Sequence, residues 1–235
     1  MSRFSLLIIL FFTISAGLKL SGSTVSDHSV NNLTDLQKDT IDKQLLYNGR
    51  VWRVLYKNVK GFEFLFTKDF LPGTITIDGK TYNNLELKYD IYNDEILTLT
   101  DRGIVLQLNK EMVEKFTLYY ENKIFYFHNI KADSINNLDG YVNVLHDKKT
   151  AFYVKYKKDI LLLADDNKND IFSEIFKTYL RKDNIIYPIG SKKDLLKVLA
   201  DKQPEVKAFI KKNKIQVSKK IPGSFIPVLI YYDTL

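Results

Sequence analysis

A chain of 235 residues, 45% hydrophobic and 27% charged, is long enough for one large domain or two small ones and too apolar for wholesale disorder. It contains no cysteine, which excludes disulfides, thiol nucleophiles and cysteine-ligated zinc or iron–sulfur sites. The net charge of +7 is uneven, because residues 24–170 hold 20 Lys and Arg against 22 Asp and Glu, whereas residues 171–235 hold 13 against 6.

Residues 1–23 have the pattern of a secretory signal peptide. Arg3 precedes an apolar run from Phe4 to Leu18, and small residues follow up to Ser23. The run is short for a membrane span, although an uncleaved N-terminal anchor is the alternative. No later apolar run is long enough to cross a bilayer, so no transmembrane span is expected after signal removal. The sequence therefore predicts an exported protein that is periplasmic, surface-bound or secreted.

Residues 24–46 are polar and are predicted to form a flexible leader. A β-rich domain is expected over residues 47–164, where Asp78-Gly79 is the strongest hairpin signal because both turn positions require positive φ. Leu71-Pro72-Gly73 is expected to break the chain between strands. The predicted strands span residues 51–56, 62–66, 74–77, 82–89, 95–100, 104–108, 116–120, 124–129, 141–145, 151–156 and 160–163. Short local connections favour an antiparallel β-meander folded as a sandwich, a partly open barrel or a strongly curved sheet.

Residues 165–235 are predicted to be a helical C-terminal part packed on the sheet, which gives an α+β fold class. Four helix starts are indicated by capping or first-turn residues: Asp170 before residues 171–180, Ser191 with Asp194 as a capping box, Pro204, and Ser224.

Six stretches carry a resemblance to known proteins: Leu46–Trp52, Phe64-Leu65-Phe66, Asp78-Gly79-Lys80, Tyr89-Asp90-Ile91-Tyr92-Asn93-Asp94-Glu95, Tyr187-Pro188-Ile189 and Lys192–Leu196. Together they resemble an uncharacterised family of exported proteins from Gram-negative bacteria of the Bacteroides type. The resemblance covers most of residues 46–235. It implies export and a layout of strands followed by helices, and it implies no activity and no catalytic residues.

Asp90, Asp94 and Glu95 form the densest acidic group of the β-rich half. They are candidate binding residues, because carboxylates are ligands for Ca²⁺ and can serve as catalytic acids and bases. The alternative is that Asn93-Asp94 simply makes the turn between two strands. The three histidines lack zinc-site spacing, and phosphate-loop, dinucleotide and nucleophile-elbow motifs are absent, so neither a metal nor a cofactor is predicted.

The basic C-terminal third contains a second candidate surface, formed by Lys192, Lys193, Lys197, Lys207, Lys211 and Lys212. It could meet an anionic envelope component such as lipopolysaccharide or anionic lipid, and the alternative is a merely solvated helical face. Lysine suits diffuse attraction better than bidentate phosphate recognition, and export argues against a nucleic-acid partner.

These observations leave three hypotheses for the function. The first is an exported, envelope-associated protein with a non-enzymatic binding or structural role, whose partner is an envelope protein or an anionic envelope component. The second is a hydrolase of polysaccharide or peptide that uses the carboxylates of the acidic turn. The third is a small-ligand carrier with a cavity inside a barrel. Whether the protein is an enzyme stays open.

Overall fold

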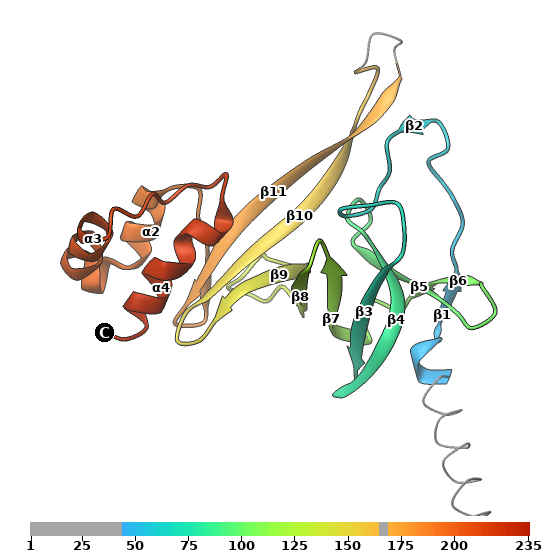
Figure 1. The fold of residues 1–235 in the computed structure, drawn as a ribbon, viewed down its shortest axis with the longest axis horizontal. Helices are drawn as coiled ribbons and strands as arrows, with labels where there is room; N and C mark the ends of the chain where they lie inside the picture. The colour runs from blue at the N-terminus through green and yellow to red at the C-terminus, as the bar shows by residue number, and fades with distance from the viewer. Residues whose placement is uncertain (1–43, 165–168) are drawn as a thin grey trace, which may run out of the picture. The chain divides into compact units, whose positions relative to one another are not determined.

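The computed structural model describes residues 44–164 and 169–235. The predicted signal peptide and nearly all of the predicted leader lie outside the described residues. Strands dominate the described chain, and its helices gather at the C-terminal end apart from a helical turn at residues 44–46 (Figure 1). The prediction of a mostly β protein with a helical C-terminal part is therefore confirmed.

The strands are β1 (Gly49–Val51), β2 (Val59–Lys60), β3 (Leu71–Ile77), β4 (Lys80–Asp90), β5 (Glu95–Leu99), β6 (Val105–Leu108), β7 (Val113–Tyr120), β8 (Lys123–Ile130), β9 (Gly140–Asp147), β10 (Ala151–Leu161), β11 (Asp170–Lys182) and β12 (Ile185–Pro188). The helices are α2 (Lys192–Val198), α3 (Gln203–Lys212) and α4 (Ile226–Tyr232), with short 3₁₀ turns η1 (Ala200–Lys202) and η2 (Pro222–Phe225). No helix of the described chain is both long and apolar enough to cross a membrane.

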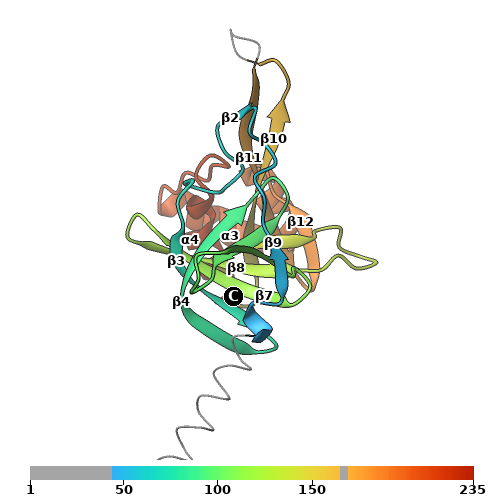
Figure 2. The same cartoon turned by 90° about the vertical axis from the view of Figure 1, so that its right-hand side faces the viewer.

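All twelve strands of the described chain belong to one sheet, which is not a closed barrel. Its order is β1-β6-β5-β4-β3-β7-β8-β9-β10-β11-β12, and β2 adds to β11 as a parallel pair. The β10–β11 hairpin extends beyond the other strands in the views of Figure 1 and Figure 2. The single parallel contact makes the sheet mixed.

The Asp78-Gly79 hairpin is confirmed: it joins β3 to β4, and both residues have positive φ, 49° and 72°. Three other strand predictions are wrong. Of the predicted strand 51–56, only Val51 lies in a strand, β1. Residues 62–66 form no strand and contribute only the isolated bridge between Phe64 and Asp90. The segment Leu71-Pro72-Gly73 is the start of β3 and does not break the chain. Pairing of β3 with β7 begins only at Gly73, so the missing N–H of Pro72 removes no hydrogen bond to β7.

The predicted helix at residues 171–180 is wrong, because this segment is strand β11. β11 pairs with β10 in unbroken antiparallel register from Arg181 opposite Ala151 to Ile171 opposite Leu161. The apolar residues that suggested one helical face are mainly aromatic or β-branched and alternate between the two faces of this strand. The β-rich part therefore runs to Pro188, beyond the predicted boundary at residue 164.

One edge of β11 is only partly paired. β12 covers Tyr179–Lys182 and β2 covers Asp170 and Ile171. Between them, residues 172–177 have no neighbouring strand on that side within the described chain.

Two main cores support the sheet. The first contains buried residues of strands β3 to β9, with the rings of Phe116 and Phe127 stacked 4.6 Å apart and Tyr89 5.4 Å from each. Leu46, which is 3% exposed, belongs to this core, so the predicted leader does not extend through residue 46. The second core joins Phe152 and Leu180 of the sheet to the helices. The helices therefore pack on the sheet.

The helices begin partly as expected. The Ser191 hydroxyl accepts the Asp194 N–H and donates to the Asp194 carboxylate, so the capping box at α2 is confirmed. Pro204 lies in the first turn of α3, as predicted. Ser224 does not cap α4, because its hydroxyl bonds the backbone of Ser218 instead.

The last helix is fastened to the sheet just after its end. The Asp233 carboxylate accepts bonds from the backbone N–H and hydroxyl of Thr150, at 3.1 and 2.8 Å. Its other oxygen lies 2.7 Å from Nε2 of His146 on β9. These contacts tie the C-terminal end of α4 to the β9–β10 turn.

Candidate functional site

The predicted acidic turn connects β4 to β5, and Asp90 organises it. Asp90 is 1% exposed. One carboxylate oxygen accepts the N–H groups of Tyr92 and Asn93, both at 2.9 Å, and the other accepts the Asn93 amide at 2.8 Å. Burial raises the pKa of Asp90, while the bonds from Asn93 and Tyr92 oppose that rise. Asp90 thus holds the backbone of the turn, as an aspartate does in an Asx turn.

Asp94 is the centre of a partly buried charge cluster. One of its oxygens accepts bonds from Nζ of Lys110 at 2.7 Å and of Lys155 at 2.8 Å, and the N–H of Tyr141 is 3.4 Å away. The other oxygen accepts the Tyr89 hydroxyl at 2.5 Å. This set of residues, Asp94 with Tyr89, Lys110 and Lys155, is here called the Asp94 cluster.

The pKa values of the Asp94 cluster show what its burial does. Burial would raise the pKa of Asp94, but the charge of Lys155 and the bonds from both lysines lower it below the usual value. For Lys155, burial lowers the pKa more than the attraction of Asp94 raises it, and Lys110 adds to the lowering. The ion pair between Asp94 and Lys155 thus favours the ionised form of Asp94 and compensates only part of the desolvation of the Lys155 ammonium group.

Gly140, the first residue of β9, is needed for the cluster to close. Its φ is +80°, which L side chains rarely adopt. A Cβ atom there would lie 1.8 Å from Oδ2 of Asp94 and 2.7 Å from Nζ of Lys155. The backbone of Gly140 therefore lies closer to the ion pair of Asp94 and Lys155 than any residue with a side chain would allow.

Glu95 does not join the Asp94 cluster. It lies opposite Asp90 in the β4–β5 register, and its Oε1 is 3.4 Å from a guanidinium nitrogen of Arg50 on β1. Burial raises the pKa of Glu95, and the charge of Arg50 opposes this. The structure thus places Asp90, Asp94 and Glu95 on one hairpin but gives each its own partners.

The chemistry open to this turn is limited by those partners. The Asp94 carboxylate already accepts from two ammonium groups and a hydroxyl, and that of Asp90 is occupied by three N–H groups. Among the described residues, no group of three or more His, Asp or Glu side chains is arranged to hold a metal ion. The acidic turn therefore acts within the fold as a structural and electrostatic element.

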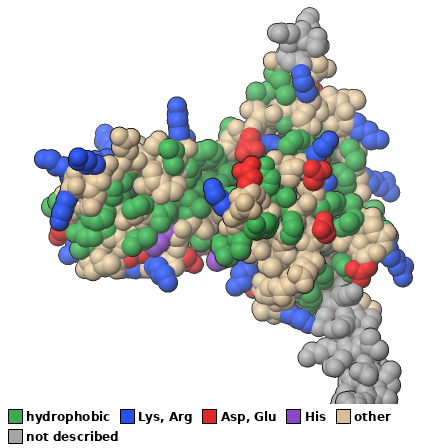
Figure 3. All heavy atoms as spheres, viewed as in Figure 1, with side chains coloured by type: hydrophobic (Ala, Val, Ile, Leu, Met, Phe, Trp, Pro, Cys, Tyr) green, Lys and Arg blue, Asp and Glu red, His purple; other side chains and the backbone are tan. Residues whose placement is uncertain are grey.

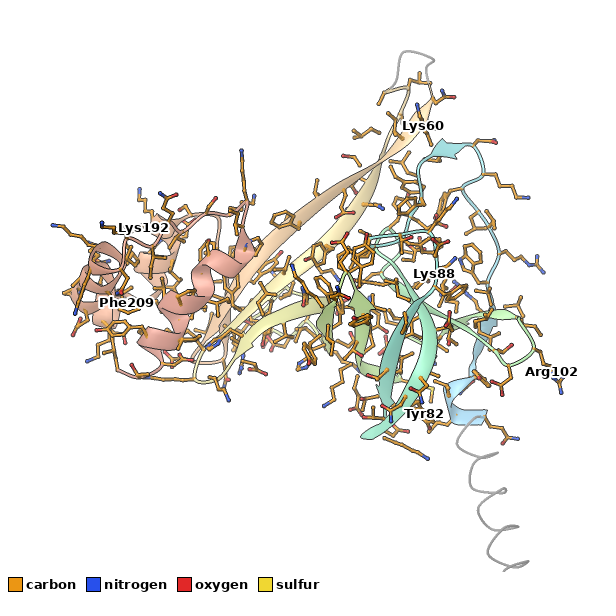
Figure 4. The ribbon with its side chains drawn as sticks, in the orientation of Figure 1. Lys60, Tyr82, Lys88, Arg102, Lys192 and Phe209 are labelled. Atoms are coloured by element: carbon orange, nitrogen blue, oxygen red, sulfur yellow. The ribbon has the colours of Figure 1, made fainter. Side chains whose placement is uncertain are left out.

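The predicted basic surface lies on α2 and α3. Its six lysines, Lys192, Lys193, Lys197, Lys207, Lys211 and Lys212, are all exposed. Lys and Arg side chains project from the helical end in Figure 3, and Lys192 and Phe209 mark that end in Figure 4. Residues 189–235 contain ten lysines, no arginine and four acidic residues, which gives this part a net charge of +6.

Three of the four acidic residues of the helical part are bound by other groups, and the fourth, Glu205, is exposed on α3. Asp194 is held by the cap of α2, and Asp233 by Thr150 and His146. Asp201 lies 2.6 Å from Nζ of Lys182 on β11 and accepts the Tyr232 hydroxyl at 2.8 Å. In the part of the chain that the structure describes, none of the ten lysines of residues 189–235 forms a salt bridge. Their charge is therefore presented to solvent.

Comparison of the chain with protein-family models, curated proteins and solved structures finds no match. The site is therefore interpreted from its geometry and chemistry alone.

Sequence reasoning found the acidic residues and the lysines but missed Lys110, Lys155 and Gly140. Asp94 is 16 residues from Lys110 and 61 from Lys155, so no local spacing joins them. For Gly140 the only available signal is a glycine at the start of a predicted strand, which is typical of a close backbone approach. That signal does not say which side chain approaches.

Proposed function

We propose that this is an exported, non-enzymatic binding protein of the cell envelope, and that its lysine-rich helical part binds an anionic envelope component. The observation that carries the proposal is the segregation of charge. Residues 189–235 account for +6 of the net charge of +7; nine of their ten lysines are exposed, and none of the ten forms a salt bridge with a described residue. A cluster of unpaired lysines attracts an anionic surface by about 1 kcal/mol per lysine close to it.

The chemistry of lysine defines the kind of partner. All ten basic residues of this part are lysines, whose compact charges suit diffuse attraction to many phosphate or carboxylate groups. Arginine would suit the bidentate recognition of a single group. An anionic lipid or lipopolysaccharide surface fits that diffuse attraction, and we propose no nucleic-acid partner.

The two other hypotheses receive less support. A hydrolase based on Asp90, Asp94 and Glu95 needs carboxylates that face a common substrate, and these three are bound to different partners. A carrier with a ligand inside a barrel needs a closed barrel, and the sheet is open. We retain the antiparallel meander as part of the proposal, because most neighbouring strands in the sheet are consecutive in the chain.

The binding proposal predicts charge-dependent sedimentation with vesicles. The full chain is expected to sediment much more strongly with vesicles that contain anionic phosphatidylglycerol than with pure phosphatidylcholine vesicles, at an ionic strength of about 0.05 M. Replacing Lys192, Lys193, Lys197, Lys207, Lys211 and Lys212 by glutamine is expected to weaken binding by roughly tenfold or more, and added salt should do the same to the unmodified chain.

The matched control removes the same charge from outside the helical part. Lys57, Lys68, Lys115, Lys123, Lys131 and Lys148 are exposed lysines of the β-rich part, and their replacement by glutamine should change binding little. Both variants keep the apolar N-terminal segment, so its contribution is the same. Equal losses in the two variants would mean that net charge matters and that the helical surface does not.

The proposed location predicts a shortened chain in the envelope. When the protein carries a C-terminal tag in a Gram-negative host, the tagged product should be found in the periplasmic or outer-membrane fraction. Its intact mass should show cleavage between Ala16 and Ser23. Recovery of the uncleaved chain would contradict the signal-peptide prediction, and recovery in the cytosol would contradict export.

A further inference from the structure

A cleft of about 280 Å³ lies beside the acidic turn, on the side of Glu95. Its lining comes from β1 and the segment that follows it, from Glu63 after β2, from Asn93 in the β4–β5 turn, and from the strands β5 and β6 through Glu95 and Gln107. Asp90 and Asp94 do not line it. The volume lies just below the usual range of ligand sites, which suits a ligand of the size of one sugar unit.

Two aromatic side chains of this cleft are fixed by their neighbours. The ring of Trp52 lies 5.9 Å from that of Phe64. Tyr56 contacts Tyr92 and Phe172 edge-on, at 5.0 and 5.6 Å, and its hydroxyl donates to Asn93 at 3.2 Å. Rings held in place by packing offer large contact areas at little entropic cost. The C–H face of a sugar ring packs well on such a surface.

The polar side chains of the cleft balance in charge. Arg50 donates to Gln107 at 2.7 Å and lies 3.4 Å from Glu95. With Arg53 and Glu63, the cleft therefore contains two guanidinium groups and two carboxylates. A ligand of either charge would meet repulsion as well as attraction there. A neutral ligand with many hydroxyl groups can donate to the carboxylates and accept from the guanidinium groups.

Glu63 adds a carboxylate to the cleft. The residue is only 7% exposed, and within the described chain it forms no salt bridge. Burial raises the pKa of Glu63, and its own backbone N–H and the charges of Lys158 and Lys88 oppose the rise. A carboxylate at this place can accept hydrogen bonds from ligand hydroxyl groups.

We propose that this cleft binds a neutral sugar unit of a glycan, with Trp52 and Tyr56 packing on the ring and Glu63, Glu95 and Arg50 bonding its hydroxyl groups. The exposed side chains of Val51 and Leu55 form the rim of the cleft. This site is separate from the lysine surface and does not depend on the function proposed for that surface.

The chain itself contains the probe for the test, because Trp52 is its single tryptophan. The full chain is titrated with neutral sugars, namely glucose, galactose, mannose, N-acetylglucosamine, xylose and their disaccharides, while tryptophan emission is recorded. At least one of them is expected to change the emission saturably, with a Kd in the millimolar range or below. Ligand-observed saturation-transfer NMR with the same sugars provides a second readout that does not require a change in emission.

The Glu63→Gln variant tests the role of the buried carboxylate, because it keeps the shape and removes the charge. It is expected to weaken binding about tenfold. The matched control is Glu86→Gln, which changes an exposed glutamate of β4 outside the cleft and should leave the affinity unchanged. Absence of saturable binding by both readouts, equal affinity of the Glu63→Gln variant, or preference for a charged sugar such as glucuronate would overturn the proposal.

Discussion

Replacing Asp94 by asparagine is expected to lower the free energy of unfolding by about 3–5 kcal/mol, because two ammonium groups then lose their shared carboxylate. The side chains of Asp94 and Lys155 are 21% and 17% exposed, so water replaces the lost charge poorly. The Tyr89 hydroxyl can still donate to the asparagine carbonyl, so the lost stability comes from the missing charge. Equilibrium unfolding in urea at pH 7 measures the effect.

Asp139 provides the control for this substitution. It lies 3.9 Å from Lys110 but is 64% exposed, so Asp139→Asn should cost less than about 1 kcal/mol. Adding Lys155→Met to Asp94→Asn should recover part of the stability, since one unpaired buried cation is then removed. Equal effects of the Asp94 and Asp139 substitutions would show that the cluster behaves as a surface ion pair.

The free energy of unfolding that is lost in the Asp94→Asn variant should depend on pH. The pKa of Asp94 is lowered in the folded chain from its usual value of 3.8. Its contribution is therefore present above that value and is lost as the pH falls through the lower pKa of the folded state. The stability difference between the natural chain and the Asp94→Asn variant should thus be constant from neutral pH to about pH 5 and shrink below about pH 4.

Truncating Phe225 to alanine is expected to cost about 3–5 kcal/mol, as for other fully buried phenylalanines. Phe225 is 0% exposed and stacks on Phe152 of β10 with ring centres 4.9 Å apart. It therefore connects the helical core directly to the sheet. Urea unfolding followed by far-UV circular dichroism measures the cost, and limited proteolysis of residues 189–235 reports loosening of the helices.

Phe209 is the matched control on the same helical part. It is partly exposed and stacks on Tyr231 at 4.1 Å, away from the sheet. Phe209→Ala should therefore cost only about 1 kcal/mol. If the two substitutions cost the same, Phe225 has no special role in attaching the helices to the sheet.

The parts of the fold that the sequence predicted are those encoded by local chemistry. Asp78-Gly79 adopts the turn that its two residue types favour, and the α2 capping box needs only residues three apart. β11 could not be recognised in this way, because its apolar residues occur at both strand and helix spacing. Its pairing with β10 along eleven residues overrides the helical pattern.

In the candidate site, too, the residues that the sequence predicted differ from those that only the tertiary structure reveals. Asp90 and Asp94 were found because they are close in the sequence, and the lysine surface because a count of charges reveals it. The partners of Asp94 come from the β6–β7 connection and from β10, and only the strand order brings them together. The contacts of Asp201 with Lys182 and of Asp233 with Thr150 and His146 likewise depend on the tertiary structure.

The half-paired edge of β11 has a consequence for solubility. The sequence of residues 172–177 is Phe-Ser-Glu-Ile-Phe-Lys. A strand of this composition would pair readily with another extended chain. Glu174 and Lys177 are exposed within this stretch, and Glu174 lies 3.7 Å from Lys158 on the neighbouring strand. A second strand that approached this edge would have to desolvate those charges. The two charged side chains therefore act as gatekeepers that keep an open edge from becoming a site of self-association.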